Sequence, residues 1–319
     1  TAQVAALTTD QVVTLSTDQT AALTTAQLAS LTTAQLVTLE TDDVAAITTA
    51  QITALKTAQI ASLTTAQVVA LTTEQAATLT TAQLAAFTTD QLVMMETEDI
   101  AAITTEQITA LTTGQISALT SGQVLALSVD QLAGLKTAQV VALTTDNLAA
   151  ITTANITALT TAQVASLTTA QVVALTTDQV STLTTNQLTS LTTAQVVALT
   201  TLQAANLGTL QAASLTTGAI AAMDVADVTA LSTAAVAAMS TDQIRALTTG
   251  ADGQVEGLTT DQVTALKTAQ VASLTTAQIT SIQTQDLVKL DSAQIKALTT
   301  AQIQALTTGD DGVQVASLL

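Results

Sequence analysis

The chain contains no cysteine, histidine, proline, tryptophan or tyrosine. Without histidine or cysteine it cannot form a Ser-His-Asp triad, a Cys-His pair or an ordinary zinc site. No glycine-rich loop precedes a helix in the manner of a phosphate-binding loop. We therefore predict a protein that is not an enzyme, with no catalytic residues and no cofactor.

Basic and aromatic residues are also scarce. Six Lys and Arg stand against 24 Asp and Glu, the net charge is -18, and Phe87 is the only aromatic residue. Nucleic acids and anionic membranes are bound by basic patches, often with stacking aromatics. The longest apolar run, 234–239, is far too short for a transmembrane span. We expect neither nucleic-acid binding nor membrane insertion.

The lack of cysteine leaves the redox compartment open. A cysteine-free, lysine-poor, acidic and threonine-rich chain fits life outside the cell better than inside it. No signal peptide is present at Thr1, and there is no initiator methionine. We expect an internal segment of a larger protein that is extracellular or on a bacterial cell surface.

What the sequence does contain is one octapeptide, repeated. The stretch 64–71 reads Thr-Thr-Ala-Gln-Val-Val-Ala-Leu, and Thr65 is taken as position 1 of the octad. The frame gives 39 octads, interrupted by insertions near 251–253 and 310–313. This predicts a single repeat domain over 1–319, with the insertions as surface turns.

Two positions of the octad are nearly always apolar. Position 7 is Leu, Ile, Met or Phe throughout, and position 4 is Val, Ile or Leu except at four octads, those of Thr20, Ala76, Ala204 and Ala212. A separation of three residues puts both side chains on one face of a helix but on opposite faces of a strand. The octad therefore favours a helix.

The boundaries of this helix are also marked. Thr64 and Gln67 form a capping box, and Leu63 and Val68 occupy the two positions of a hydrophobic staple. A continuous helix is excluded, because eight residues rotate the apolar pair by about 80° per repeat. The sequence predicts an all-α solenoid or superhelix of very short helices, one per octad, with positions 4 and 7 inward and stability from stacked neighbours.

A longer period suggests the size of one superhelical turn. The octad at 40–47 reappears in similar form at 96–103, and large residues recur at position 5 at a mean interval of about 3.3 octads, at Val13, Val37, Val69, Val93, Leu125, Val141, Val173 and Val197. Segmental duplication is one explanation. The other is that position 5 meets the next coil only at certain angles, which predicts roughly 3.3–3.5 octads per turn.

Acidic clusters are the candidate metal sites. The calcium candidates are Glu40, Asp42, Asp43, Glu96, Glu98, Asp99, Asp310 and Asp311. The first six lie at the cap, second and third positions of predicted helices, where carboxylates are stabilised without an ion. The insertions lack the ligand count and spacing of an EF-hand. We therefore predict no metal site, with calcium binding as the alternative.

Two further surfaces suggest binding. Residues 201–240 are the most apolar region, where Leu202 and Leu210 replace a polar position 2 beside Ala204 and Ala212. These leucines either offset the thin core or meet a partner. The dense threonines suggest ice binding, but an N-cap threonine has already used its hydroxyl. A non-integer number of octads per turn would also keep the threonines out of ranks.

The run Leu63–Gln75 and its copies resemble the octapeptide tracts of very large secreted or surface-exposed bacterial proteins, often described as adhesin-like. The resemblance covers essentially the whole chain. It implies an extracellular stalk, filament or spacer, with copies of itself or other surface-appendage subunits as partners. We predict a non-enzymatic structural protein, with a binding or adhesion module using 201–240 or the acidic clusters as the alternative.

Overall fold

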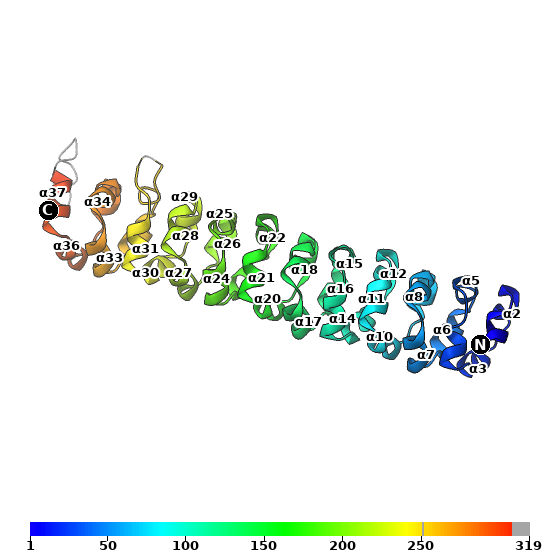
Figure 1. Cartoon of the computed structure of the whole chain (residues 1–319). Coiled ribbons are helices and arrows are strands. Elements are labelled where there is room, and N and C mark those ends of the chain that lie inside the picture. Colours follow the sequence, from blue (N-terminus) through cyan, green and yellow to red (C-terminus); the bar gives the residue numbers. More distant parts are fainter. Residues whose placement is uncertain (251, 308–319) are drawn as a thin grey trace. The chain divides into compact units, whose positions relative to one another are not determined.

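The computed structural model describes residues 1–250 and 252–307, which contain 37 short helices and no strand. They fall into two compact units, Thr1–Leu159 and Thr160–Leu319, which are described separately. Figure 1 shows the helices in chain order. The all-helical repeat solenoid predicted from the sequence is confirmed.

The first unit contains twenty helices. Their bounds are α1 Ala2–Ala5, α2 Thr9–Val13, α3 Thr17–Ala21, α4 Thr25–Leu28, α5 Thr33–Leu36, α6 Thr41–Ala46, α7 Thr49–Ala54, α8 Thr57–Ser62, α9 Thr65–Val69, α10 Thr73–Thr78, α11 Thr81–Ala86, α12 Thr89–Met94, α13 Thr97–Ala102, α14 Thr105–Ala110, α15 Thr113–Ala118, α16 Ser121–Ala126, α17 Val129–Gly134, α18 Thr137–Ala142, α19 Thr145–Ala150 and α20 Thr153–Ala158.

The second unit contains the remaining helices of the described residues. Their bounds are α21 Thr161–Ser166, α22 Thr169–Ala174, α23 Thr177–Thr182, α24 Thr185–Ser190, α25 Thr193–Val197, α26 Thr201–Ala205, α27 Thr209–Ser214, α28 Thr217–Ala222, α29 Val225–Ala230, α30 Thr233–Ala238, α31 Thr241–Ala246, α32 Thr260–Thr264, α33 Thr268–Ser273, α34 Thr276–Ser281, α35 Thr284–Leu287, α36 Ser292–Ala297 and α37 Thr300–Thr307.

Helix α9 shows how one octad folds. Thr64 is extended, with φ -70° and ψ 158°, and its hydroxyl accepts a hydrogen bond of 3.2 Å from the Gln67 amide. In return, Gln67 Oε1 accepts a bond of 2.9 Å from the Thr64 amide. Leu63, at the end of α8, is extended as well. The capping box thus starts this helix, as it starts most of the others, and an extended residue at position 7 turns the chain into the next one.

The core is formed by positions 4 and 7, as predicted. Val68 is fully buried and Leu71 is 4% exposed. Burial follows position rather than residue type, because Thr20 and Ala76, which replace the usual aliphatic residue at position 4, are also fully buried. An isolated helix of this length would not persist in water, so its stability comes from its neighbours.

Neighbouring coils are joined by hydrogen bonds between residues 28 apart. Gln67 Nε2, for example, donates to the Leu39 carbonyl at 2.9 Å. Twenty-eight residues are 28/8 = 3.5 octads, and helices three apart in sequence pack together within each unit, as α10 does with α13. One turn therefore takes 3.5 octads, at the upper end of the predicted range.

The large residues at position 5 do not share one environment. Val13, Val69 and Leu125 are 42%, 38% and 49% exposed, whereas Val37 and Val93 are half-buried. The contact that repeats regularly with the turn is made by position 3.

The hydrogen bonds that flank the first insertion are kept. Thr248 and Gln254 form the usual reciprocal pair, at 3.0 and 3.1 Å, although they lie six residues apart instead of three. Gly250 has a φ of 119°, and a Cβ on Gly253 would lie 2.6 Å from the Thr249 carbonyl carbon. Both sites therefore need glycine. Asp252 is exposed, and the described residues of this octad contain no helix.

Candidate functional site

The groups with hydrogen-bonding chemistry gather at position 3 of the octad. Gln67 is 2% exposed, and its Nε2 donates to the carbonyls of Leu36 and Leu39 at 3.0 and 2.9 Å. Leu36 is the last residue of α5, where helix carbonyls lack partners within the helix. The Leu36 carbonyl also accepts from the Leu39 amide at 3.1 Å. One glutamine therefore caps the start of its own helix and bonds to two carbonyls at the end of a helix one coil earlier.

The same arrangement recurs in the second unit. Gln203 donates to the carbonyls of Val172 and Leu175 at 2.9 and 2.7 Å. After the insertion, Gln254 reaches Met223 at 2.7 Å over 31 residues, the usual 28 plus the inserted three. The sequence predicted the capping half of this role and missed the inter-coil half.

Shorter side chains at position 3 use a different partner. Asn147 Nδ2 donates to the Leu119 carbonyl, 28 residues earlier, at 3.0 Å, and its Oδ1 accepts from Ser121 Oγ at 3.2 Å. Asp227 accepts from the Thr201 hydroxyl at 2.8 Å, again 26 residues earlier. A hydroxyl at position 1 of the preceding coil thus serves the shorter residue.

The predicted acidic clusters are split between surface and interior. Glu40 and Asp42 are exposed, whereas Asp43 is 2% exposed at position 3. In the second cluster Glu96 and Glu98 are exposed, while Asp99 is 1% exposed. The three carboxylates of each cluster therefore do not share one environment.

Capping by the N-cap glutamates is a prediction that the structure contradicts. Glu40 and Glu96 make no side-chain bond to their helices, whereas the N-cap Asp291 accepts a bond of 2.7 Å from the Gln294 amide. The N-cap Asp224 also makes no side-chain bond to its helix, so the difference does not follow from residue type alone.

Burial raises the pKa of the Asp99 carboxyl, and the negative charge of Glu96 adds to the rise. The Thr73 hydroxyl partly opposes it, yet neither Asp99 oxygen has a hydrogen bond of normal geometry. Burial likewise raises the pKa of Asp43, whose Oδ2 has no partner.

No group of three or more acidic side chains in the described part of the chain is placed to hold a metal ion. The remaining calcium candidates, Asp310 and Asp311, lie outside the described residues. The calcium alternative therefore has no geometric support within residues 1–250 and 252–307.

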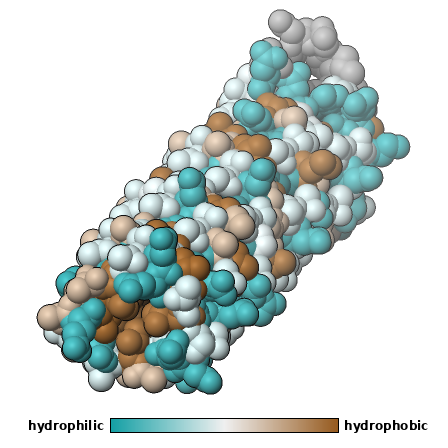
Figure 2. Space-filling view, turned by 90° about the vertical axis from the view of Figure 1, so that its right-hand side faces the viewer, coloured by the Kyte–Doolittle hydropathy of each residue, from teal (hydrophilic) through white to brown (hydrophobic). Residues whose placement is uncertain are grey.

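The apolar surface at 201–240 is exposed where the sequence placed it. Leu202 and Leu210 are 71% and 76% exposed, while Ala204 and Ala212 are fully buried. The leucines therefore do not offset the thin core beneath them. On the face drawn in Figure 2, hydrophobic residues are mostly scattered among hydrophilic ones, apart from a gathering at the near end.

The threonines of adjacent coils do not line up. Because a turn takes 3.5 octads, a residue 28 positions from an N-cap threonine is at position 4 of its octad, as Leu36 is relative to Thr64. N-cap threonines return to the same register only every second coil, as Thr8 and Thr64 do. The Thr64 hydroxyl also accepts a hydrogen bond from the Gln67 amide.

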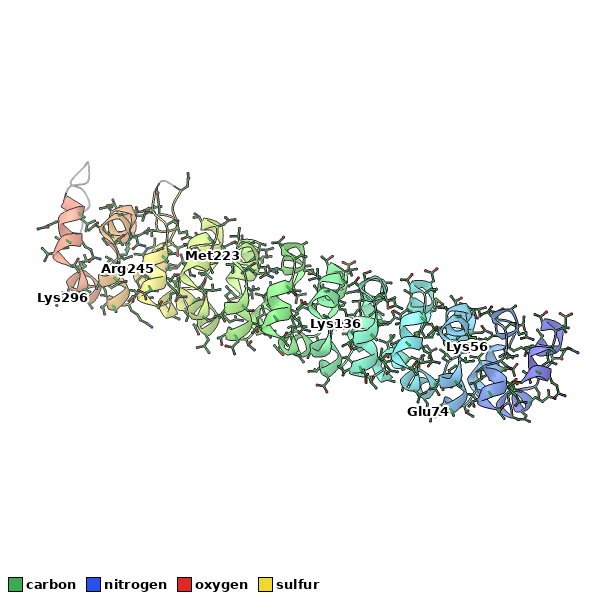
Figure 3. The ribbon with its side chains drawn as sticks, viewed as in Figure 1. Lys56, Glu74, Lys136, Met223, Arg245 and Lys296 are labelled. Carbon is green, nitrogen blue, oxygen red and sulfur yellow. The ribbon has the colours of Figure 1, made fainter. Side chains whose placement is uncertain are left out.

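The helices of the described residues are all too short and too polar to cross a lipid bilayer. Side chains of both charges lie on the coils, as the labelled Lys56, Glu74 and Lys136 show (Figure 3).

A family model, the ALTTAQ repeat, matches the chain at residues 20–57, 36–73, 44–81, 92–129, 126–161, 148–185, 220–251 and 279–318. The chain belongs to the ALTTAQ repeat family. The repeat tract predicted from the sequence is thereby confirmed. A search of curated proteins found no match.

The ALTTAQ letters can be read at 297–302, from position 6 of one octad to position 3 of the next. They include the position-7 leucine Leu298, which is half-buried, the N-cap Thr299 and the inter-coil Gln302, whose Nε2 donates to the Leu274 carbonyl at 2.8 Å. The family signature of the ALTTAQ repeat is thus the set of residues that builds the coil.

Proposed function

We propose that this ALTTAQ repeat chain is a non-enzymatic structural protein, an extended extracellular stalk, filament or spacer. The observation that carries the proposal is the position-3 hydrogen-bond ladder. The amide of Gln67 bonds both to its own helix and to the preceding coil, and Gln203 does the same in the second unit. The recurring polar side chain is used to hold the coil, and each coil presents the same bonding pattern to the next.

This pattern extends without closing on itself, which is what a spacer requires. In a solenoid each repeat contacts only its neighbours, so length grows with the number of repeats. The exposed surface is threonine-rich and acidic, which keeps an extended body soluble. A bacterial surface location rests on the resemblance to adhesin-like octapeptide tracts and on the absence of cysteine.

Deleting residues 57–112 tests the extended form. The deletion removes 56 residues, seven whole octads and two turns, so the remaining glutamines still find partners 28 residues earlier. We expect the maximum dimension in small-angle X-ray scattering to fall by about 16–20 Å, two helix-packing distances. A globular protein that lost 56 residues would shrink much less, because its radius of gyration would fall by only about 1–2 Å. Unchanged helicity per residue controls for folding.

Location is tested separately, with antibodies against the tract applied to intact and to permeabilised cells of the source organism. We expect equal labelling of both. Labelling only after permeabilisation would contradict the extracellular part of the proposal and leave the spacer part standing.

A binding module is the second candidate, favoured by the exposure of Leu202 and Leu210. Two large aliphatic side chains on consecutive helices α26 and α27 form an apolar surface that the core does not need. If this surface binds a partner, replacing both leucines by Gln, the residue type common on the chain's polar positions, is expected to abolish adhesion of beads coated with the tract. Adhesion that survives the replacement would exclude this surface as the binding site.

A further inference from the structure

Four interior aspartates stand where the coil normally has a hydrogen-bond donor. Asp43, Asp99, Asp227 and Asp286 are 2%, 1%, 3% and 2% exposed, and all occupy position 3. Asn147, which has the same length and shape, donates from Nδ2 to the carbonyl 28 residues earlier. An ionised aspartate has no proton to donate.

The acceptor opposite each aspartate is also without a donor. For Asp99 the carbonyl 28 residues earlier belongs to Leu71, which receives no hydrogen bond from the described residues. By contrast, Leu39, at the same position, receives the Gln67 amide. Both Asp99 oxygens and Asp43 Oδ2 are buried without a partner. A buried carboxyl and a buried carbonyl that both lack a hydrogen-bond partner cost free energy. One proton on the carboxyl would let it donate a hydrogen bond to the carbonyl.

The surroundings of Asp99 favour the neutral acid. Its own helix α13 adds Glu96 and Glu98, α10 adds Glu74, and neither α9 nor α16 contains a titratable residue. The charges near this carboxyl are therefore negative. Burial raises its pKa, and Glu96 and Glu98 raise it further.

Asp43 has the same character. It is accompanied by Glu40 and Asp42 at the start of α6, and Asp18 lies on the packed helix α3. Burial raises the pKa of Asp43, the Glu40 amide lowers it through a hydrogen bond, and the charges of Glu40 and Asp42 raise it.

Asp227 and Asp286 differ, because their carboxylates accept hydrogen bonds from the Thr201 and Thr260 hydroxyls. Burial also raises the pKa of Asp227, which the Thr201 hydroxyl lowers and Asp224 raises.

We propose that Asp43 and Asp99 are proton-dependent locks between neighbouring coils. The neutral carboxylic acid donates its proton to the main-chain carbonyl 28 residues earlier, as the amide of Asn147 does. When the proton leaves to solvent, two acceptors face each other and the contact loosens. The proton is the only species exchanged.

The sign of the pH dependence follows from the direction of the shift. Because the folded-state pKa is raised, the lock's contribution to stability is complete below the unfolded-state pKa and is lost as the pH rises through the folded-state pKa. Acidification therefore tightens these contacts, the opposite of what salt-bridged carboxylates do.

Hydrogen exchange on the full chain at pH 4.5 and pH 7, corrected for intrinsic exchange rates, tests the proposal. We expect amides of α9 to α13 near Asp99 to be about tenfold better protected at pH 4.5, the effect of gaining roughly one buried hydrogen bond. Amides of α22, which contains no buried acid, report the general effect of lowering the net charge. An equal change in both regions would overturn the proposal.

Two variants separate the lock from surface charge. Asp99→Asn supplies a permanent donor and is expected to remove the local pH dependence, with high protection at both pH values. Asp90→Asn removes a charge from an exposed acid that does not contribute to the pKa shift of Asp99, and it is expected to keep the local pH dependence. A pH difference that survives Asp99→Asn would overturn the proposal. If that variant does not fold, Asp43→Asn and a carboxyl ¹³C titration of the wild-type chain decide, and titration of Asp99 at the usual aspartate value would contradict it.

Discussion

At the scale of the residue, the glutamine at position 3 decides how coils are joined. It occupies 31 of the 39 octads. Its oxygen accepts from the N-cap amide of its own helix, and its nitrogen donates to carbonyls of the previous coil. Only an amide side chain offers an acceptor and two donors at one end.

The sequence contained a sign of this second role. A capping box accepts Glu as readily as Gln, yet Glu stands at position 3 in none of the octads, although the chain uses it at position 2, as in Glu74. The capping role was predictable from spacing alone. The inter-coil bond was not, because it depends on which residues lie 28 apart in space, and that period is a result of packing.

Replacing Gln67 by Glu tests the inter-coil role. The carboxylate can still accept from Thr64 but then faces the carbonyls of Leu36 and Leu39. We expect a loss of about 1–3 kcal/mol in the free energy of unfolding at pH 7, the cost of buried groups left without a donor. Urea unfolding measures it.

Gln11→Glu is the matched control. Gln11 makes the capping bond to the Thr8 amide at 2.9 Å and is exposed. We expect its replacement to be nearly neutral. Equal losses in the two variants would show that capping alone explains the glutamine.

At the scale of the element, local sequence sets the helices and their neighbours stabilise them. Position 7 ends each helix in an extended conformation, as Leu63 does, and also fills the core. This much followed from the capping box, the staple and the three-residue spacing. The missing helix between α31 and α32 did not, because the three inserted residues were expected only to add a turn.

Substitution of Leu71 by Asp probes the coupling between elements. It places a charge in a site that is 4% exposed, so we expect a local cost of several kcal/mol. Neighbouring octads should lose hydrogen-exchange protection more than distant ones, because each repeat is stabilised by its neighbours. Uniform loss along the chain would contradict nearest-neighbour stabilisation.

Ala66→Asp adds the same charge five residues earlier, at an exposed position 2. Many octads already carry an acid there, such as Asp10 and Asp90. A carboxylate in the first turn interacts favourably with the helix dipole. This variant is expected to match or slightly exceed the wild type in stability.

At the scale of the whole molecule, we expect folding without an ion. The exposed acids of the two clusters are separated from the buried ones, and no described group of acids is placed to bind a metal. Chelators are therefore expected to change the free energy of unfolding by less than about 1 kcal/mol, below the linkage of a saturated structural site. Melting with and without a chelator measures this. A fall of about ten degrees or more would mean that the clusters around Glu40 and Glu96 bind calcium.

The 28-residue hydrogen bond has a genetic consequence. Gln67 bonds to main-chain carbonyls, which every residue type has. Gln254 keeps such a partner across an insertion. Loss or gain of whole octads by unequal recombination would therefore give each remaining glutamine a new but equivalent carbonyl. A tract encoded in this way can change length between generations without a compensating mutation, so its reach can be selected independently of its fold.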